Sequence, residues 1–223
     1  MSKKIYINPG HSDKDPGAVG FETERKLNVK TANYMNEYLL ANYDCQTKVT
    51  AGSVNSTATV AAEANSWGAD LLVSIHNNAG GGDGYEALVY SEKRKALGQI
   101  FEKYVKAAGQ NSRGVKLRPD LGILRLTNMP AVLNEGAFVD NLKDIQDWNE
   151  DHELKKLGIA YAEATAEAAS LEKKVVAPAP APEESDVIYR VQVGAFRNKS
   201  GAEETQKKLK AAGFDGIIVT GKK

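Results

Sequence analysis

The sequence predicts an α/β fold in which a single twisted, mostly parallel sheet is flanked by helices and followed by a small α+β half-repeat. Strand-like and helix-like patterns alternate along most of the chain, which is typical of layered α/β proteins. The run 71–75 is almost wholly apolar, as in a strand that is buried on both faces. A length of 223 residues suits one such domain with a small appendage.

The elements follow in order along the chain. A first strand is expected at 4–8, and a helix at 24–40, where apolar residues recur at roughly helical spacing. A second helix is expected at 57–67, with Gly68 as its C-terminal stop. The remaining expected strands are 46–50, 71–75, 85–90, 122–126 and 131–134, and the remaining helices are 95–108 and 151–171.

The composition changes after this first domain, which is predicted to span 1–172. Residues 173–186 are rich in alternating alanine and proline, which cannot continue a helix and favours an extended spacer. This segment is interpreted as an interdomain linker. Beyond it, 187–223 is predicted to form a small unit. Its expected elements are a strand at 189–196, a helix at 202–212 and a strand at 216–220.

Charge and targeting signals narrow the class of protein. The formal net charge is zero, so nothing drives the chain as a whole toward nucleic acid or a membrane. Residues 187–223 carry eight Lys/Arg against three Asp/Glu, and this basic end favours an anionic polymer. A strand begins by about Lys3, which leaves no room for a signal peptide, and no apolar run reaches transmembrane length. Synthesis in the cytoplasm without an export signal is therefore expected.

Two of the three histidines stand where an apolar run gives way to a Gly- or Asn-rich segment. They are His11 and His76. A lone histidine at a strand end is more often structural, but a pair at two strand ends indicates a metal site. A catalytic zinc takes three protein ligands, so a carboxylate is needed, and Glu22 and Glu24 are the nearby candidates. Glu135 closes another apolar run and is a candidate general base.

The other reactive side chains are assigned no chemistry. His152, near the start of a predicted helix, fits no metal motif and is interpreted as a surface residue. Cys45 is the only cysteine, which excludes an intramolecular disulfide, and it is interpreted as a structural thiol.

Four ordered motifs carry a resemblance to a known family. They are 8–11 with 15–18, 24–28, 74–79 and 130–135. Together they resemble the type 3 class of zinc-dependent N-acetylmuramoyl-L-alanine amidases over roughly the first three quarters of the chain. The resemblance implies that His11, Glu24 and His76 bind zinc and that Glu135 is the catalytic acid/base. Glu24 is preferred to Glu22 because the family's ligand precedes a stretch like 25–28. The chain departs from the family's pattern at Ser12 and in the order of 136–138.

The resemblance also implies an activity. It is hydrolysis of the amide between the lactyl group of N-acetylmuramic acid and the L-alanine of the peptidoglycan stem peptide. The expected setting is cell lysis, by a phage endolysin or an autolysin of the sporulating mother cell, after release by lysis or a holin. A zinc peptidase acting on the stem peptide and a non-catalytic wall-binding or regulatory protein remain the alternatives.

The C-terminal segment carries a second resemblance. The run 191–196, followed by 202–203 and 209–215, resembles one half of the SPOR repeat, a peptidoglycan-binding module that normally has two such halves. One half is too small to bury an adequate core by itself. Pairing with a second copy of the chain, as a homodimer, is one expected solution.

Overall fold

The computed structural model describes residues 2–54, 56–174 and 192–220. The chain divides into two units, residues 1–175 and 176–223, and each unit is described by itself. The predicted boundaries of the catalytic domain, linker and repeat stay predictions. Most of the predicted linker lies outside the described residues.

The first unit is built on a six-stranded sheet with the strand order β2-β1-β3-β6-β4-β5. Neighbouring strands are parallel except that β4 runs antiparallel to β6. The strands are β1 (Lys3–Pro9), β2 (Cys45–Val49), β3 (Leu71–Asn78), β4 (Tyr85–Val89), β5 (Ser112–Leu117) and β6 (Ala131–Phe138). The predicted fold class, a mostly parallel sheet flanked by helices, is confirmed.

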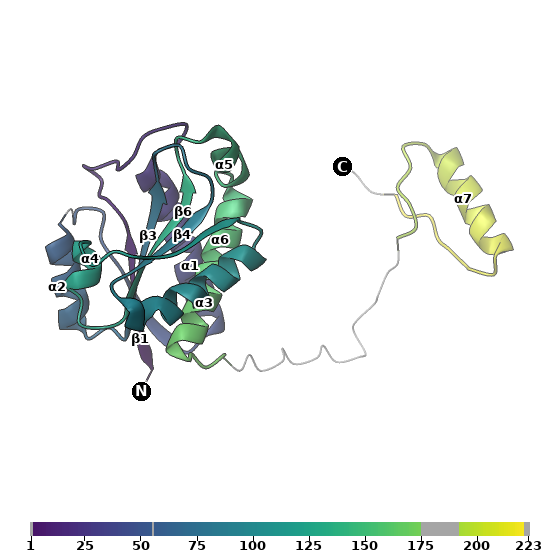
Figure 1. Ribbon diagram of the computed structural model, residues 1–223. Coiled ribbons are helices and arrows are strands. Elements are labelled where there is room, and N and C mark those ends of the chain that lie inside the picture. The colour runs from purple at the N-terminus through teal and green to yellow at the C-terminus, as the bar shows by residue number, and fades with distance from the viewer. Residues whose placement is uncertain (1, 55, 175–191, 221–223) are drawn as a thin grey trace. The chain divides into compact units, whose positions relative to one another are not determined.

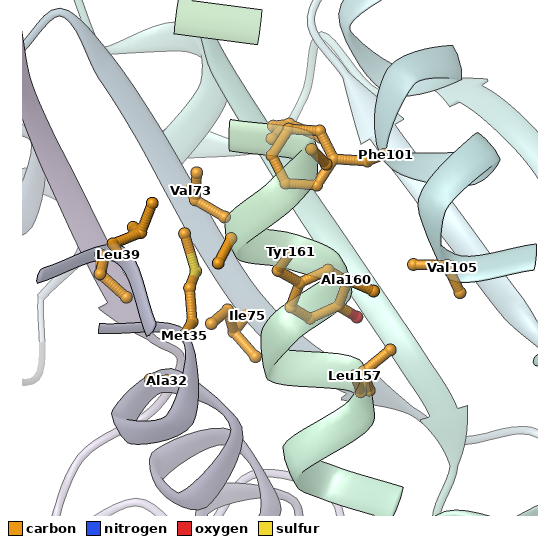
Figure 2. Close-up of a cluster of buried hydrophobic side chains, with 14 of the residues drawn as sticks. Ala32, Met35, Leu39, Val73, Ile75, Phe101, Val105, Leu157, Ala160 and Tyr161 are labelled. Carbon is orange, nitrogen blue, oxygen red and sulfur yellow. The ribbon is translucent and has the colours of Figure 1, made fainter. Parts of the chain in front are cut away.

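Helices cover both faces of this sheet (Figure 1). The helices of the first unit are α1 (Glu24–Asn42), α2 (Thr57–Trp67), α3 (Lys95–Ala107), α4 (Gly122–Arg125), α5 (Leu142–Asp147) and α6 (Asp151–Ala169), with a short 3₁₀ turn at Glu92–Arg94. The side chains of α1, α3 and α6 form the larger core with one face of the sheet, and Figure 2 shows part of it around Met35, Ile75 and Tyr161. The shorter helices α2 and α4 pack on the other face, against Tyr6, Leu72 and Leu133.

The alternation of side chains along the strands places polar residues on the face that α2 and α4 cover only in part. Tyr6, Leu72, Leu88 and Leu133 belong to the core under these two helices. Residues two positions away on the same strands point to the same face; they come after these residues on β1, β3 and β6 and before Leu88 on the antiparallel β4. They are Asn8, Ser74, Glu86 and Glu135, and His76 follows Ser74 at the same interval. A row of polar side chains therefore lies across this face of the sheet.

Several predicted elements differ from the structure. The prediction of a strand at 122–126 is wrong, because this apolar run forms α4, whose Ile123 and Leu124 are buried against α2 and the sheet. Strand β5 and helix α5 were not predicted. Strands β3 and β6 continue past their apolar runs because they keep pairing with each other to Phe138. His76 and Glu135 therefore lie within strands and not in the loops that follow them.

The described part of the second unit, 192–220, contains one helix, α7 (Lys199–Ala211), close to the predicted 202–212. The predicted strand at 216–220 is not formed, and neither is the described part, 192–196, of the predicted strand at 189–196. Residues 189–191 lie outside the described residues. A strand needs a hydrogen-bonded neighbour, and the described part of this unit provides none. Within the described residues of the whole chain, no helix is long and apolar enough to cross a membrane.

Candidate metal centre

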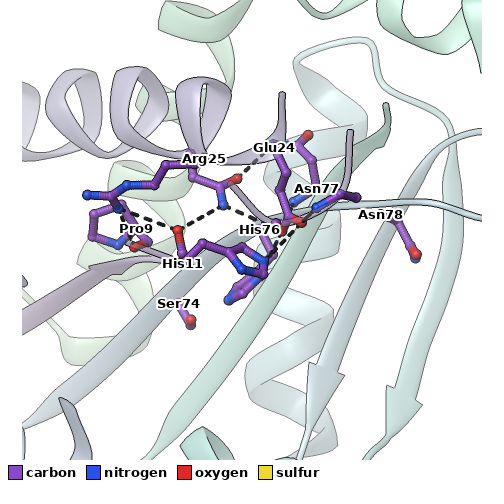
Figure 3. A network of polar contacts seen from close by, with 12 residues as sticks. Pro9, His11, Glu24, Arg25, Ser74, His76, Asn77 and Asn78 are labelled. Carbon is purple, nitrogen blue, oxygen red and sulfur yellow. Dashed lines mark hydrogen bonds and ion pairs between the residues drawn. The ribbon is translucent and has the colours of Figure 1, made fainter. Parts of the chain in front are cut away.

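The three side chains predicted as metal ligands converge at the C-terminal ends of β1 and β3 (Figure 3). His11 follows β1, His76 lies on β3, and Glu24 is the first residue of α1. One potential ligand atom from each lies within 4.8 Å of the others, and the two imidazole ring centres are 5.0 Å apart. Two imidazole nitrogens and a carboxylate oxygen are a donor set that catalytic zinc takes from proteins. These residues therefore fit a divalent metal ion.

Glu24 is the centre of this cluster. One carboxylate oxygen, Oε1, lies 2.9 Å from Nδ1 of His76 and accepts a hydrogen bond from the backbone N–H of Asn77. The other, Oε2, lies 3.0 Å from Nε2 of His11 and accepts a hydrogen bond from the backbone N–H of Ala18. Burial opposes ionisation, but the contacts with the two histidines outweigh it and hold the pKa of Glu24 well below its usual range. The carboxylate is therefore charged and available as a ligand at neutral pH.

Two glycines allow the backbone to approach the imidazoles closely. A β-carbon at Gly10 would lie 2.2 Å from the ring of His76. A β-carbon at Gly17, whose φ is +69°, would lie 2.6 Å from both the Glu24 carboxylate and the ring of His11. His11 itself has a φ of 67°, in the left-handed region that non-glycine residues rarely adopt. Such strain persists only where the surrounding contacts fix the backbone.

Polar side chains of α1 provide those contacts (Figure 3). The guanidinium of Arg25 donates hydrogen bonds to the carbonyls of Pro9 and Gly10, at 2.9 and 3.4 Å. The fully buried Asn28 donates to the Gly10 carbonyl at 3.3 Å and accepts from the side chain of Asn77 at 2.9 Å. Sequence reasoning gave these residues no role. For Asn28 the available signal was its spacing, because a residue four positions after the ligand lies on the same face of α1. The spacing gave no such signal for Arg25.

Asp15 orients the first histidine. Its carboxylate lies 2.9 Å from Nδ1 of His11, which leaves Nε2 of the ring directed at Glu24. Hydrogen bonding to Glu24 raises the pKa of His11 to about 9; burial opposes this rise, and Asp15 adds to it. In the metal-free chain His11 is thus a cation at neutral pH. A carboxylate on the second ring nitrogen of a ligand histidine is a common way to fix its orientation.

Glu135, the predicted acid/base, lies beside the cluster. It is in register with His76 across β3 and β6, and its buried Oε2 has no hydrogen-bond partner within the described residues. Desolvation by burial raises the pKa of Glu135 to about 7, with His76 opposing the shift and the carboxylates of Glu24 and Glu86 adding to it. A carboxyl group with this pKa can both take up and release a proton near neutral pH.

The remaining candidates lie away from this cluster. Glu22 contacts Lys26 at 2.8 Å, so Glu24 is the carboxylate that lies with the histidines. His152 is exposed on the surface beside Glu153. Cys45 is a buried free thiol, and burial raises its pKa.

Comparison with known proteins relates the chain to peptidoglycan amidases. Residues 5–167 match the sequence model of the N-acetylmuramoyl-L-alanine amidases, and residues 160–220 match that of the SPOR domain. The chain is 32% identical over 225 residues to the N-acetylmuramoyl-L-alanine amidase CwlM of Bacillus licheniformis, covering 97% of this chain and 84% of that protein. It is 34% identical to an endolysin of Bacillus phage SPP1, covering 82% of this chain and 72% of the endolysin.

A sporulation-specific N-acetylmuramoyl-L-alanine amidase of Bacillus subtilis is 30% identical, covering 97% of this chain and 84% of that protein. Among solved structures, the catalytic domain of the amidase CwlV from Paenibacillus polymyxa superimposes with a TM-score of 0.72 at 25% identity. It covers 76% of this chain and 99% of that domain. The predicted recognition of an amidase with a SPOR region is confirmed. The chain belongs to the N-acetylmuramoyl-L-alanine amidase family.

Proposed function

We propose that the chain hydrolyses the amide between the lactyl group of N-acetylmuramic acid and the L-alanine of the stem peptide. His11, Glu24 and His76 hold the zinc ion, and Glu135 is the catalytic acid/base. The observation that carries this proposal is the convergence of the three ligands beside Glu135 in a chain of this family.

The chain's own residues account for proton transfer. When bound, zinc supplies Lewis-acid activation of water and of the substrate carbonyl. Glu135 accepts a proton from the attacking water. It then returns this proton to the alanine nitrogen, because an amide anion is a poor leaving group. Its pKa of about 7 suits both steps, and its Oε2, which has no hydrogen-bond partner among the residues that the structure describes, is free to receive the proton.

The C-terminal unit is proposed to hold the enzyme on peptidoglycan, as its match to the SPOR domain supports. Several of its large apolar side chains are exposed: Val193, Phe196, Phe214, Ile217 and Val219. Their burial against a second copy of the chain is part of this proposal. Light scattering over a range of protein concentrations tests it, because a mass that stays monomeric throughout contradicts the dimer.

The proposed setting is cell lysis. It rests on the similarity to a sporulation-specific amidase and to a phage endolysin. Synthesis in the cytoplasm and action on the wall after lysis or passage through a holin complete this proposal.

Digestion of purified peptidoglycan tests the activity. The protein is incubated with intact sacculi, with and without a chelator, and the released ends are identified by mass spectrometry. New L-alanine amino termini with intact glycan strands, lost on chelation and restored by zinc, are expected. Cleavage within the stem peptide would identify a zinc peptidase instead, and wall binding without cleavage would identify a non-catalytic protein.

Two variants separate the assigned roles. Glu135→Gln is expected to bind zinc normally and to lose at least about 100-fold in kcat, since general acid–base catalysis contributes that much. His76→Ala is expected to lose zinc and activity together. Near-normal turnover by Glu135→Gln would place the acid/base elsewhere.

A further inference from the structure

Charged side chains continue across the sheet beyond the proposed acid/base. His76 on β3 is in register with Glu135 on β6, and Glu135 is in register with Glu86 on β4. Next to Glu86, the last strand β5 contributes Arg113 and Lys116, which both contact its carboxylate. The metal ligand, the acid/base and this second charged group therefore form one row on the open face of the sheet.

The second group has one more positive charge than its buried carboxylate neutralises. Glu86 is only 5% exposed and accepts hydrogen bonds from Arg113 Nε at 2.6 Å and from Lys116. Burial opposes ionisation of Glu86, but these two cations hold its pKa below its usual value. One cation suffices to balance one carboxylate. One of the two positive charges is therefore not balanced by Glu86. The side chains that carry them, Arg113 and Lys116, are 42% and 43% exposed.

The guanidinium of Arg113 is the better placed of the two to bind a ligand. It uses Nε for Glu86, and within the described residues its two Nη groups have no hydrogen-bond partner. Its central carbon lies 5.2 Å from the centre of the Phe138 ring, at the end of β6. A guanidinium that is fixed through Nε and by an aromatic ring presents its outer edge in a defined orientation, which suits a carboxylate.

The spacing of the strands gives the distance from the scissile bond. Adjacent strands lie about 4.8 Å apart, and β3, β6 and β4 are neighbours in that order. The midpoint between β3 and β6, where His76 and Glu135 are in register, is therefore one and a half strand spacings, or about 7 Å, from a group over β4. An extended peptide advances about 3.5 Å per residue. A substrate whose first amide lies between His76 and Glu135, and whose stem runs toward β5, brings its second residue to Arg113.

We propose that Arg113, fixed by Glu86, binds the free α-carboxylate of the second stem residue, a γ-linked glutamate, and so selects peptidoglycan in which this group is not amidated. The inference rests on the proposed amidase function. Lys116 supplies the charge that balances Glu86, so the Nη edge of Arg113 is available to the substrate while Nε stays on Glu86.

Three synthetic N-acetylmuramoyl tripeptides test this proposal with the zinc-loaded full-length protein. The first carries free carboxylates, the second carries an amide on the α-carboxyl of residue two, and the third carries an amide on the side-chain carboxyl of residue three. The first and third are expected to be cleaved equally well. The second is expected to show about a tenfold lower kcat/KM, mainly through KM, since a hydrogen bond to a charged group is of this strength.

Arg113→Ala is the decisive variant, and it leaves Lys116 on Glu86 so that the buried carboxylate keeps a partner. It is expected to cleave the first substrate as poorly as the second, so that the preference between the two is lost. Arg113→Lys retains part of the preference. Arg118→Ala is the matched control, because this arginine directly follows β5 and is 43% exposed, much like Arg113, but is paired with Asp120. It is expected to keep the full preference.

Binding provides a second readout that does not depend on turnover. Calorimetry with Glu135→Gln protein is expected to give a Kd for the first substrate about tenfold lower than for the second, and equal values once Arg113→Ala is added. Equal cleavage of the first two substrates by the unmodified protein, or a preference that survives Arg113→Ala, overturns the inference. Discrimination against the third substrate alone assigns the site to another carboxylate and also overturns it. Failure to cleave any of the three overturns the amidase proposal itself.

Discussion

Zinc binding should compete with a proton on His11, and the competition can be measured as a pH dependence of affinity. In the metal-free chain, Nε2 of His11 lies 3.0 Å from the Glu24 carboxylate, and its pKa is raised to about 9. A histidine binds zinc only in its neutral form. At pH 7 the neutral fraction is about one in 100, so the apparent affinity is about 100-fold below its limiting value.

The expected result is a linear rise of the logarithm of the zinc association constant with pH. Between pH 7 and pH 8.5 the logarithm of the zinc association constant should rise by about one for each pH unit, because one proton leaves for each metal bound. Above about pH 9 the curve should flatten. Competition against a chromophoric chelator of known affinity measures the constant. Calorimetry in buffers of different ionisation enthalpy counts the released proton independently.

Asp15→Asn tests the origin of the slope. Removing this carboxylate, which lies 2.9 Å from Nδ1 of His11, lowers the histidine pKa and moves the rising part of the curve to lower pH. Asp70→Asn is the matched control, because Asp70 precedes β3 at the opposite end of the sheet. An affinity that does not change between pH 7 and pH 8.5 would refute the reasoning, since it would mean that His11 is neutral before zinc binds.

Three further predictions concern stability and geometry. The folded-state pKa of His11 lies above its unfolded value of about 6.5, so this stabilisation is complete below that pH and is lost as the pH rises through about 9. The thermal midpoint of chelator-treated protein should therefore fall over this interval, and a constant midpoint would contradict the raised pKa. Gly10→Ala places a β-carbon 2.2 Å from the ring of His76 and should weaken zinc binding at least about tenfold with an unchanged circular dichroism spectrum; unchanged affinity would show that the ring can move aside. The buried hydroxyl of Tyr161 has no hydrogen-bond partner within the described residues, so Tyr161→Phe should leave the free energy of unfolding in urea unchanged or raise it by up to about 1 kcal/mol; a clear loss would reveal a partner for this hydroxyl.

The candidate site was predictable to the extent that its residues occur at the ends of apolar runs. His11 and His76 stand out because the chain has only three histidines, and the family-like stretch 25–28 directly after Glu24 favoured it over Glu22. The pairing of His76 with Glu135 was not predictable. It depends on the register of two strands that are distant in sequence, and on their continuation through polar residues, which a local pattern does not reveal.

The missed elements share a physical reason. Strand β5 lies at the edge of the sheet, and none of its residues is fully buried, so its sequence lacks the apolar run that marks a central strand. The run 122–126 is short and apolar, and periodicity cannot separate a buried strand from a buried helical turn at that length. The structure forms the turn, in which Ile123 and Leu124 are buried against α2 and the sheet.

Hydrogen bonds from α1 explain how His11 can keep its strained backbone conformation without help from a bound metal ion. His11 has a left-handed backbone, which costs free energy, and Arg25 and Asn28 hold the preceding carbonyls through hydrogen bonds. Both residues belong to α1, the helix that also carries Glu24 and is packed into the main core. The ligand loop is therefore fixed by the same rigid element that supplies the carboxylate. Zinc binding therefore requires little further ordering of the backbone. The main process that competes with it is protonation of His11, which the contact with Glu24 favours.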